Sequence, residues 1–365
     1  MEKSRVITRM HFENWRSLRD VTIDDLTPIT VLVGSNSSGK SNIVDALHFL
    51  RTSITEKNVF ATVLRWGGRD KIQPIGIKGN MSTTLDLSYA FLASARTFTD
   101  KISLLFQGNA VFYGRQIIED ATNKVLPDVE ADPLAARINP FKQERLQLLR
   151  ENFFPEFSIK NDPNILQESD FSIIDPFARN VPFMLLSMQY THSDLYEYLQ
   201  TDLKDLLDHV NALYVDLTGD EISLSVQEKT HLGEDAPSIS AGTARIIAML
   251  TAYYALDMDE HFTPGLVVIE EPDTAIHPLL LQKFVGLLRN YVSREDTPRQ
   301  FILTTHNPMF LNLFEPEEVR IVERQNGETT VSKVDMELAN TWFKQDGAYN
   351  LGDLWTTRLL GGVPE

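Results

Sequence analysis

One segment of eight residues near the amino terminus constrains the fold more than any other feature. Residues 34–41 read GSNSSGKS and fit the pattern G-x-x-x-x-G-K-[ST] in full. In this pattern the glycines let backbone N–H groups turn inward around phosphate. The apolar run Thr30–Val33 precedes the segment, and apolar residues at helical spacing follow it from Asn42 to Leu50. This order predicts a phosphate-binding loop between a strand and a helix, rather than a serine-rich turn with a surface lysine.

The loop supplies most of the residues that we expect to contact a nucleotide. Lys40 should reach the β- and γ-phosphates, and the Ser41 hydroxyl should bind Mg²⁺. The amino terminus of the following helix adds its dipole to the same anion site. The expected contacts in the loop are Gly34, Ser35, Asn36, Ser37, Ser38, Gly39, Lys40 and Ser41.

A second apolar run ends in two adjacent carboxylates. Glu270 and Glu271 directly follow Leu266–Ile269. The carboxyl ends of parallel strands lie at one edge of a sheet, so these acids should lie beside the phosphate loop. We expect Glu270 to hold hydrated Mg²⁺, and Glu271 to orient and polarise the attacking water. The alternative is a strand that ends in solvated acids.

Two further positions complete the expected site. His306 follows the apolar strand Phe301–Thr304 and is placed to hydrogen-bond the γ-phosphate or the attacking water. Ser240 is a predicted N-cap of a helix that runs to Leu256, and Gly242 allows close backbone approach. A helix amino terminus with small side chains can bind an anion, but the same pattern also fits a plain helix cap.

The apolar patterns predict an α/β fold. Strands that read as buried on both faces alternate with helices, which indicates a mostly parallel core sheet. Between Thr83 and Ile118 the apolar residues alternate, as in an antiparallel β subdomain. Asp194–Leu213 has the spacing of an amphipathic helix without sustained heptads, so no long coiled coil is expected. We predict an amino-terminal lobe with the loop and the antiparallel strands, a helical insertion, and a carboxy-terminal lobe, over residues 1–120, 121–215 and 216–365.

Composition narrows the function classes. The 365 residues include no cysteine, which excludes disulfides, cysteine metal sites and cysteine nucleophiles. The net charge of −17 argues against a broad basic surface for nucleic acid or anionic membrane, although a local basic groove is compatible with it. No apolar run approaches the ~20 residues of a membrane span, and the first residues have no signal-peptide core. A cytoplasmic protein without a membrane partner is expected.

The ordered motifs resemble the ABC-type ATPase heads of the RecF, SMC and OLD-like families, within the AAA-type ATP-binding proteins. Phe12–Asp20 looks like the strand that precedes the loop in these families, and Asn36 and Asn42 are typical of them. The segment that follows Glu270, with His277-Pro278 after the acids, is most similar to the OLD-like form. Asn350–Trp355 also resembles single-chain relatives of this type.

The resemblance implies ATP and Mg²⁺ as ligands and hydrolysis of ATP to ADP and phosphate. It places Arg16 and Asn42 near the nucleotide and makes Gln73 a candidate metal ligand in the Q-loop, although Arg16 and Gln73 could equally be surface residues. It also implies a homodimer or higher homo-oligomer. In such an assembly, Ser240 and Gly242 of one subunit would complete the ATP site of the other.

Two departures from the families shape the expected function. The residues between Ser41 and Ser240 lack the sustained heptads of SMC proteins. The residues after His306 show no acidic metal constellation like that of the Toprim domain in OLD nucleases. We therefore expect an ATP-hydrolysing switch that regulates a second protein, with a nuclease in antiphage defence as the implied effector. The alternative is a DNA-repair or recombination ATPase that clamps duplex DNA directly.

Overall fold

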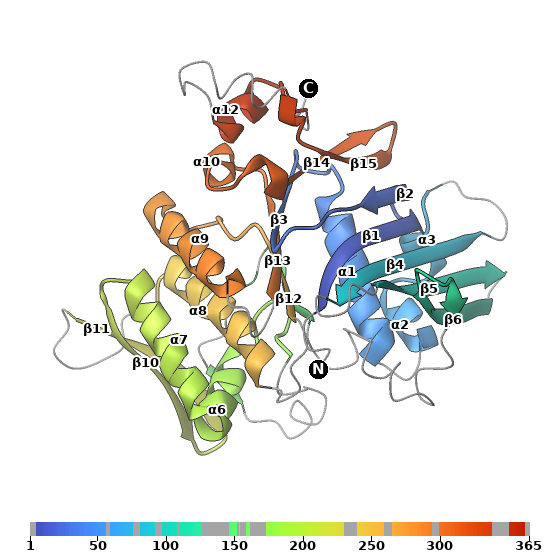
Figure 1. Ribbon diagram of the computed structural model, residues 1–365. Helices are drawn as coiled ribbons and strands as arrows, with labels where there is room; N and C mark the ends of the chain where they lie inside the picture. The colour runs from blue at the N-terminus through green and yellow to red at the C-terminus, as the bar shows by residue number, and fades with distance from the viewer. Residues whose placement is uncertain are drawn as a thin grey trace.

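The computed structural model describes most of the chain, and the structural statements below refer to these residues alone. They are 5–55, 59–75, 81–91, 97–107, 110–125, 146–151, 153, 158–160, 173–229, 239–258, 265–293, 299–337 and 350–361. Their strands form three sheets, and helices lie on both sides of the central one (Figure 1).

The central sheet carries the predicted site. Its order is β15 (Glu328–Lys333), β14 (Val319–Gln325), β3 (Ile29–Val33), β13 (Arg299–Thr305), β12 (Gly265–Glu270) and β8 (Leu146–Leu149). All neighbours pair in parallel except β14 and β15, which form an antiparallel hairpin. The predicted mostly parallel core sheet is therefore confirmed, and the segments that follow β3, β12 and β13 leave from the same edge.

An antiparallel sheet packs beside the central one, as the alternating apolar pattern predicts. Its order is β2 (Leu18–Ile23), β1 (Arg5–Trp15), β4 (Ser82–Phe91), β5 (Thr97–Gln107), β6 (Ala110–Glu119) and β7 (Lys124–Val125). The turn between β1 and β2 approaches the phosphate loop, because the backbone N–H of Thr329 in β15 donates to the carbonyl of Ser17 at 2.8 Å.

A third, small antiparallel sheet corrects one predicted helix. It contains β10 (Val210–Thr218), β11 (Glu221–Glu228) and β9 (Ser158–Lys160). The helix expected over Asp194–Leu213 is α7 (Ser193–Leu206), and its last predicted residues lie in β10. Val210 and Leu213 fit a helical spacing, but pairing with β11 fixes them in a strand.

Helices cover both faces of the central sheet (Figure 1). On the side of the antiparallel sheet lie α1 (Lys40–Thr55), α2 (Val59–Arg65) and α3 (Arg69–Ile72). On the opposite side lie α6 (Val181–Thr191), α7, α8 (Ala241–Tyr254) and α9 (Pro278–Val292). The remaining helical segments are η1 (Ala255–Asp257), α10 (Pro308–Leu311), η2 (Pro316–Glu318) and α12 (Leu351–Thr356).

Burial on both faces explains the unbroken apolar runs in the sequence. Val31 and Val33 pack into a core with α6, α7, α8 and α9, whereas Leu32 packs into a second core with α1 and the antiparallel sheet. In β12, Val267 faces the first core and Val268 the second. A strand enclosed in this way can carry charged side chains only where it ends, which places its acids at the sheet edge.

The predicted division into three parts does not follow the sheets. β8 lies within residues 121–215, yet it pairs with β12 of the central sheet. The hairpin of β10 and β11 crosses the predicted boundary at residue 215. Within the described residues, we find no helix that is long and apolar enough to span a membrane.

Candidate active site

The phosphate loop joins β3 to α1, and its glycines are required by packing. Ser37 has a φ of 67° and Gly39 a φ of 115°. A Cβ on Gly39 would lie 2.1 Å from Oγ1 of Thr329, and a Cβ on Gly34 would lie 2.2 Å from the carbonyl oxygen of Val322. Real Cβ atoms do not make such contacts, so the β14–β15 hairpin closes against a loop that only glycine permits at these positions.

Lys40 folds back onto the loop that it follows. Its Nζ donates to the carbonyl oxygens of Gly34 at 2.7 Å and Ser35 at 2.9 Å. Burial lowers the pKa of Lys40, whereas the nearby Glu271 and Glu270 carboxylates act in the opposite direction. The ammonium is therefore held at the loop by two carbonyl acceptors, which phosphate oxygens can replace.

A chain of polar contacts fixes the loop from outside. The Thr329 hydroxyl donates to the carbonyl of Ser38 at 2.9 Å, and the Ser17 hydroxyl lies 2.7 Å from that of Thr329. Nδ2 of Asn42 donates to the Ser17 hydroxyl at 2.6 Å. The Ser38 hydroxyl is itself buried and has no partner among the described residues. An unpaired buried hydroxyl is costly, so this loop fits a ligand that brings oxygen atoms.

Ser41 and Glu270, two of the three expected metal ligands, lie in contact. Glu270 ends β12 with 3% of its surface exposed, and the Ser41 hydroxyl hydrogen-bonds its carboxylate. Burial raises the pKa of Glu270, although Arg150 and Ser41 act in the opposite direction.

This donor set fits Mg²⁺ that arrives with a nucleotide. A hydroxyl and a carboxylate are the hard oxygen ligands that Mg²⁺ takes together with phosphate oxygens and waters. The described residues contain no group of three or more His, Asp and Glu side chains that could hold a metal ion alone. The phosphates and waters would have to supply the remaining ligands.

Glu271 and His306, the two expected catalytic residues, also lie in contact. Glu271 has a φ of 47°, which is strained for a residue that carries a side chain. Its backbone N–H is held by the carbonyl and the hydroxyl of Thr304, each at 3.1 Å. Nδ1 of His306 lies 2.7 Å from Oε1 of Glu271. The His306 side chain is 45% exposed and that of Glu271 is 11% exposed, so His306 covers a nearly buried carboxylate.

The helix that begins at Ser240 is anchored to the turn after the acids. Ser240 is the N-cap of α8, as predicted, and its hydroxyl accepts a backbone N–H of the first helical turn. A Cβ on Gly242 would lie 3.0 Å from the carbonyl oxygen of Ala275. Nη2 of the buried Arg245 donates to the carbonyl of Glu271 at 2.7 Å. A movement of α8 would therefore displace the backbone of Glu271.

Arg16 lies near the loop, and Gln73 does not contact it. Arg16 forms an ion pair with Asp45 of α1, one turn beyond the loop. Nε2 of Gln73 donates to the carbonyl of Met81 at 2.7 Å, and its Oε1 accepts from Arg69 at 2.8 Å. These partners hold the Gln73 side chain between α3 and the start of β4, so we do not propose Gln73 as a metal ligand.

Four residues of the site lay outside the sequence prediction. Arg150 contacts Glu270 from the end of β8, and its signal was the short apolar run Leu146–Leu149 that it follows. Asp45 lies in a segment where the apolar spacing predicted only a helix. No local pattern marked Thr329 or Arg245, because their partners lie far away in sequence.

Comparisons with known proteins agree with this geometry. A family model described as "AAA domain, putative AbiEii toxin, Type IV TA system" matches residues 29–312, which include the loop, the acids and His306. An ATP/GTP phosphatase of Helicobacter pylori is 20% identical over 359 residues, which cover 85% of this chain and 88% of that protein. The Old nuclease of Escherichia phage P2 is 22% identical over 352 residues. That match covers 84% of this chain and 57% of the nuclease.

A solved structure supports the fold. The SMC head bound to the C-winged helix domain of ScpA matches with a TM-score of 0.60 at 13% identity. The match covers 91% of this chain and 98% of that chain. At this identity the similarity shows the fold alone, and it confirms the predicted class, an α/β head with a phosphate loop.

Proposed function

This chain belongs to the AAA domain family whose model it matches, and from that premise we propose that it hydrolyses ATP and works as a molecular switch. It is an ABC-type ATPase of the RecF, SMC and OLD-like group. The observation that carries the proposal is the 2.7 Å contact between Nδ1 of His306 and Oε1 of Glu271 at the sheet edge that holds Glu270.

Nucleotide binding uses the loop and the first turn of α1. Backbone N–H groups of residues 34–41 surround the phosphates, and Lys40 moves its ammonium from two carbonyls to the β- and γ-phosphates. Ser41 and Glu270 would hold Mg²⁺, which would neutralise phosphate charge. Arg16 supports the loop from the β1–β2 turn, through a contact with Asn42 in the first turn of α1.

Hydrolysis uses Glu271 as the general base. Its carboxylate accepts a proton from water while the water oxygen attacks the γ-phosphorus and the bond to the ADP oxygen breaks. An imidazolium at His306 would donate through Nδ1 to this carboxylate and through Nε2 to the γ-phosphate. The proton on Glu271 then leaves to solvent, and the pair returns to its starting state.

In the ATP-bound state, which we call the closed state, two copies of the chain form a head-to-tail homodimer. The Ser240 end of one subunit would contact the γ-phosphate on the loop of the other, so that Ser240 and Gly242 act in trans. Leu279 is 67% exposed and Met309 63% exposed, and they lie in the first turns of α9 and α10. These helices follow Glu271 and His306 in the chain, so apolar side chains flank the catalytic edge and would be covered in a dimer.

The switch regulates a second protein. ATP joins two subunits and hydrolysis releases them, so the nucleotide changes the population of the closed state. The match to the phage P2 Old nuclease supports a nuclease as the effector. The match covers 57% of that protein, and we propose that a partner supplies the nuclease activity. The net charge of −17 gives no support to direct clamping of duplex DNA.

The proposal is tested by measuring the release of phosphate from ATP in the presence of Mg²⁺. The wild-type protein should turn over, and Glu271→Gln should lower the rate by about 10²–10⁴-fold, the usual contribution of a general base. Asp216→Asn is the matched control, because Asp216 is an exposed acid of β10. An inactive wild-type protein, or an equally active Glu271→Gln variant, would overturn the proposed reaction.

A further inference from the structure

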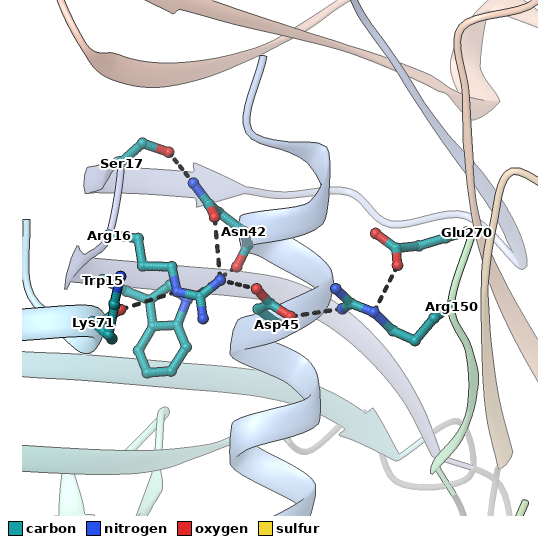
Figure 2. Close-up of polar contacts among 8 residues, drawn as sticks. All are labelled: Trp15, Arg16, Ser17, Asn42, Asp45, Lys71, Arg150 and Glu270. Carbon is teal, nitrogen blue, oxygen red and sulfur yellow. Dashed lines mark hydrogen bonds and ion pairs between the residues drawn. The ribbon is translucent and has the colours of Figure 1, made fainter. Parts of the chain in front are cut away.

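Arg150 bridges two carboxylates between the magnesium-binding residues and α1 (Figure 2). Its Nε lies 2.9 Å from Oε2 of Glu270, and its Nη1 donates to Oδ1 of Asp45 at 2.6 Å. Arg150 directly follows β8, which pairs in parallel with β12. The two strands therefore deliver Arg150 and Glu270 to the same edge of the sheet.

Asp45 also pairs with Arg16, so it connects Arg150 to the β1–β2 turn. Its second carboxylate oxygen pairs with Arg16, which also donates from Nε to the carbonyl of Lys71 at 3.2 Å. Nη1 of Arg16 lies 3.5 Å from Oδ1 of Asn42, the residue after Ser41 (Figure 2). A continuous polar chain thus runs from Glu270 back to the end of the phosphate loop.

The Glu270 carboxylate needs a positive partner. It is 3% exposed, and a buried carboxylate without a counter-charge is strongly unfavourable. In the described part of the chain, Arg150 is the cationic side chain within ion-pair distance of Glu270. Mg²⁺ would bring its own positive charge to the same carboxylate.

We propose that Arg150 is a positioning residue that neutralises Glu270 until magnesium nucleotide binds, and that it then leaves Glu270 and stays paired with Asp45 alone. This inference rests on the proposed function, because it assigns Glu270 to Mg²⁺. The two cations compete for one carboxylate, so metal binding breaks the Arg150–Glu270 contact. Asp45 keeps hold of the displaced guanidinium, and the polar chain carries the change to Arg16. A guanidinium suits this bridge better than an ammonium, because its planar fork presents a separate N–H donor to each carboxylate.

If Arg150 and Mg²⁺ compete for Glu270, substitutions of Arg150 and Asp45 should shift the Mg²⁺ concentration at half-saturation in opposite directions. Arg150→Gln removes the competing cation, so less Mg²⁺ should half-saturate the site. The expected decrease is about tenfold, the factor for one charge-assisted hydrogen bond. Asp45→Asn removes the second negative charge and leaves Glu270 as the carboxylate that retains Arg150, so more Mg²⁺ should be needed. A residue that only supported the fold would shift both values in the same direction.

The experiment titrates Mg²⁺ into the full chain with a fixed concentration of mant-labelled adenylyl-imidodiphosphate, a non-hydrolysable ATP analogue. Fluorescence reports binding without turnover, and thermal unfolding confirms that each variant is folded. Arg150→Lys should return the midpoint part of the way toward the wild-type value. Arg289→Gln is the matched control, because Arg289 pairs with Glu318 through two contacts of 2.9 Å near the start of β14, away from the catalytic edge.

Each outcome separates the inference from the function on which it rests. Opposite shifts of the Mg²⁺ midpoint for Arg150→Gln and Asp45→Asn, with the midpoint of Arg289→Gln unchanged, support the release of Arg150 from Glu270. An unchanged or raised midpoint for Arg150→Gln overturns it and leaves ATP binding intact. Wild-type binding that does not respond to Mg²⁺, or a response that survives in Glu270→Gln, overturns the metal assignment itself and the inference with it.

Discussion

Nδ1 of His306 lies 2.7 Å from Oε1 of Glu271, and the two residues reach this contact from neighbouring parallel strands, β13 and β12. The strained backbone of Glu271 aims its carboxylate across the strand ends, where Thr304 holds its N–H. In the proposed reaction, a carboxylate aimed in this way would accept a proton from the attacking water once a γ-phosphate lies on the loop.

Glu271→Gln should retain ATP and lose hydrolysis, because glutamine keeps the shape of the side chain but accepts no proton. The ATP-bound dimer should then persist, and light scattering after size exclusion measures it directly. A Glu271→Gln protein that binds ATP but stays monomeric would contradict the link between an uncleaved γ-phosphate and closure.

Lys40→Ala should abolish or strongly weaken ATP binding, because the buried ammonium supplies the positive charge at the β- and γ-phosphates. Calorimetry with Mg²⁺ present measures the affinity. Lys283→Ala, which removes an exposed lysine paired with Asp208, is the control. Unchanged affinity in folded Lys40→Ala would rule out the loop as the nucleotide site.

Met309→Asp should weaken the ATP-dependent dimer without changing the affinity of one subunit for ATP. The side chain is 63% exposed beside the catalytic edge, and a carboxylate there would have to be desolvated on closure. Leu217→Asp, which changes an exposed apolar residue of β10, is the matched control. Equal dimerisation of wild type and Met309→Asp would move the interface elsewhere.

The free energy of unfolding should fall with acid partly because of one histidine. His48 packs against Trp66 with ring centroids 5.2 Å apart, and burial lowers its pKa to about 3. Its unfolded pKa is about 6.5, so its contribution is present above that pH and is lost as pH falls toward 3. Between pH 7 and pH 5 this group should cost about 2 kcal/mol.

Urea unfolding at several pH values measures this effect. His48→Phe should flatten the acid loss of stability. His11→Gln is a control of opposite sign, because the hydrogen bond to Asp86 raises the pKa of His11, and the stability that it adds is lost as pH rises. Equal pH slopes for wild type and His48→Phe would contradict the assigned pKa.

The sequence predicted those parts of the site that lie at the ends of long local patterns. The loop follows a buried strand and opens a helix, Glu270 follows the four apolar residues Leu266–Ile269, and His306 follows three apolar residues and two threonines. Periodicity marks such strands, and parallel pairing brings their ends to one edge. The core sheet and most helices could be placed in this way.

The remaining parts depend on contacts between segments that are distant in the sequence. Thr329 holds the phosphate loop from a hairpin 291 residues after Ser38. Gln73 was chosen by resemblance, whereas the strand that ends beside Glu270 is β8, a run of four residues in a segment without clear periodicity. The helix over Asp194–Leu213 was predicted too long, because a strand shares its apolar spacing over the last turn.

Phosphate release by mixed dimers of Ser240→Arg and Lys40→Ala protein tests the central claim most directly. Each variant alone should be inactive, because a bulky cation blocks phosphate approach at the start of α8 in one and the loop lysine is missing in the other. A head-to-tail mixed dimer has one site with both changes and one site with neither, so activity should return. Co-expression with two affinity tags isolates mixed dimers whose subunits do not exchange. Recovered turnover is the predicted result, and verified mixed dimers without any turnover would contradict a site shared between two subunits.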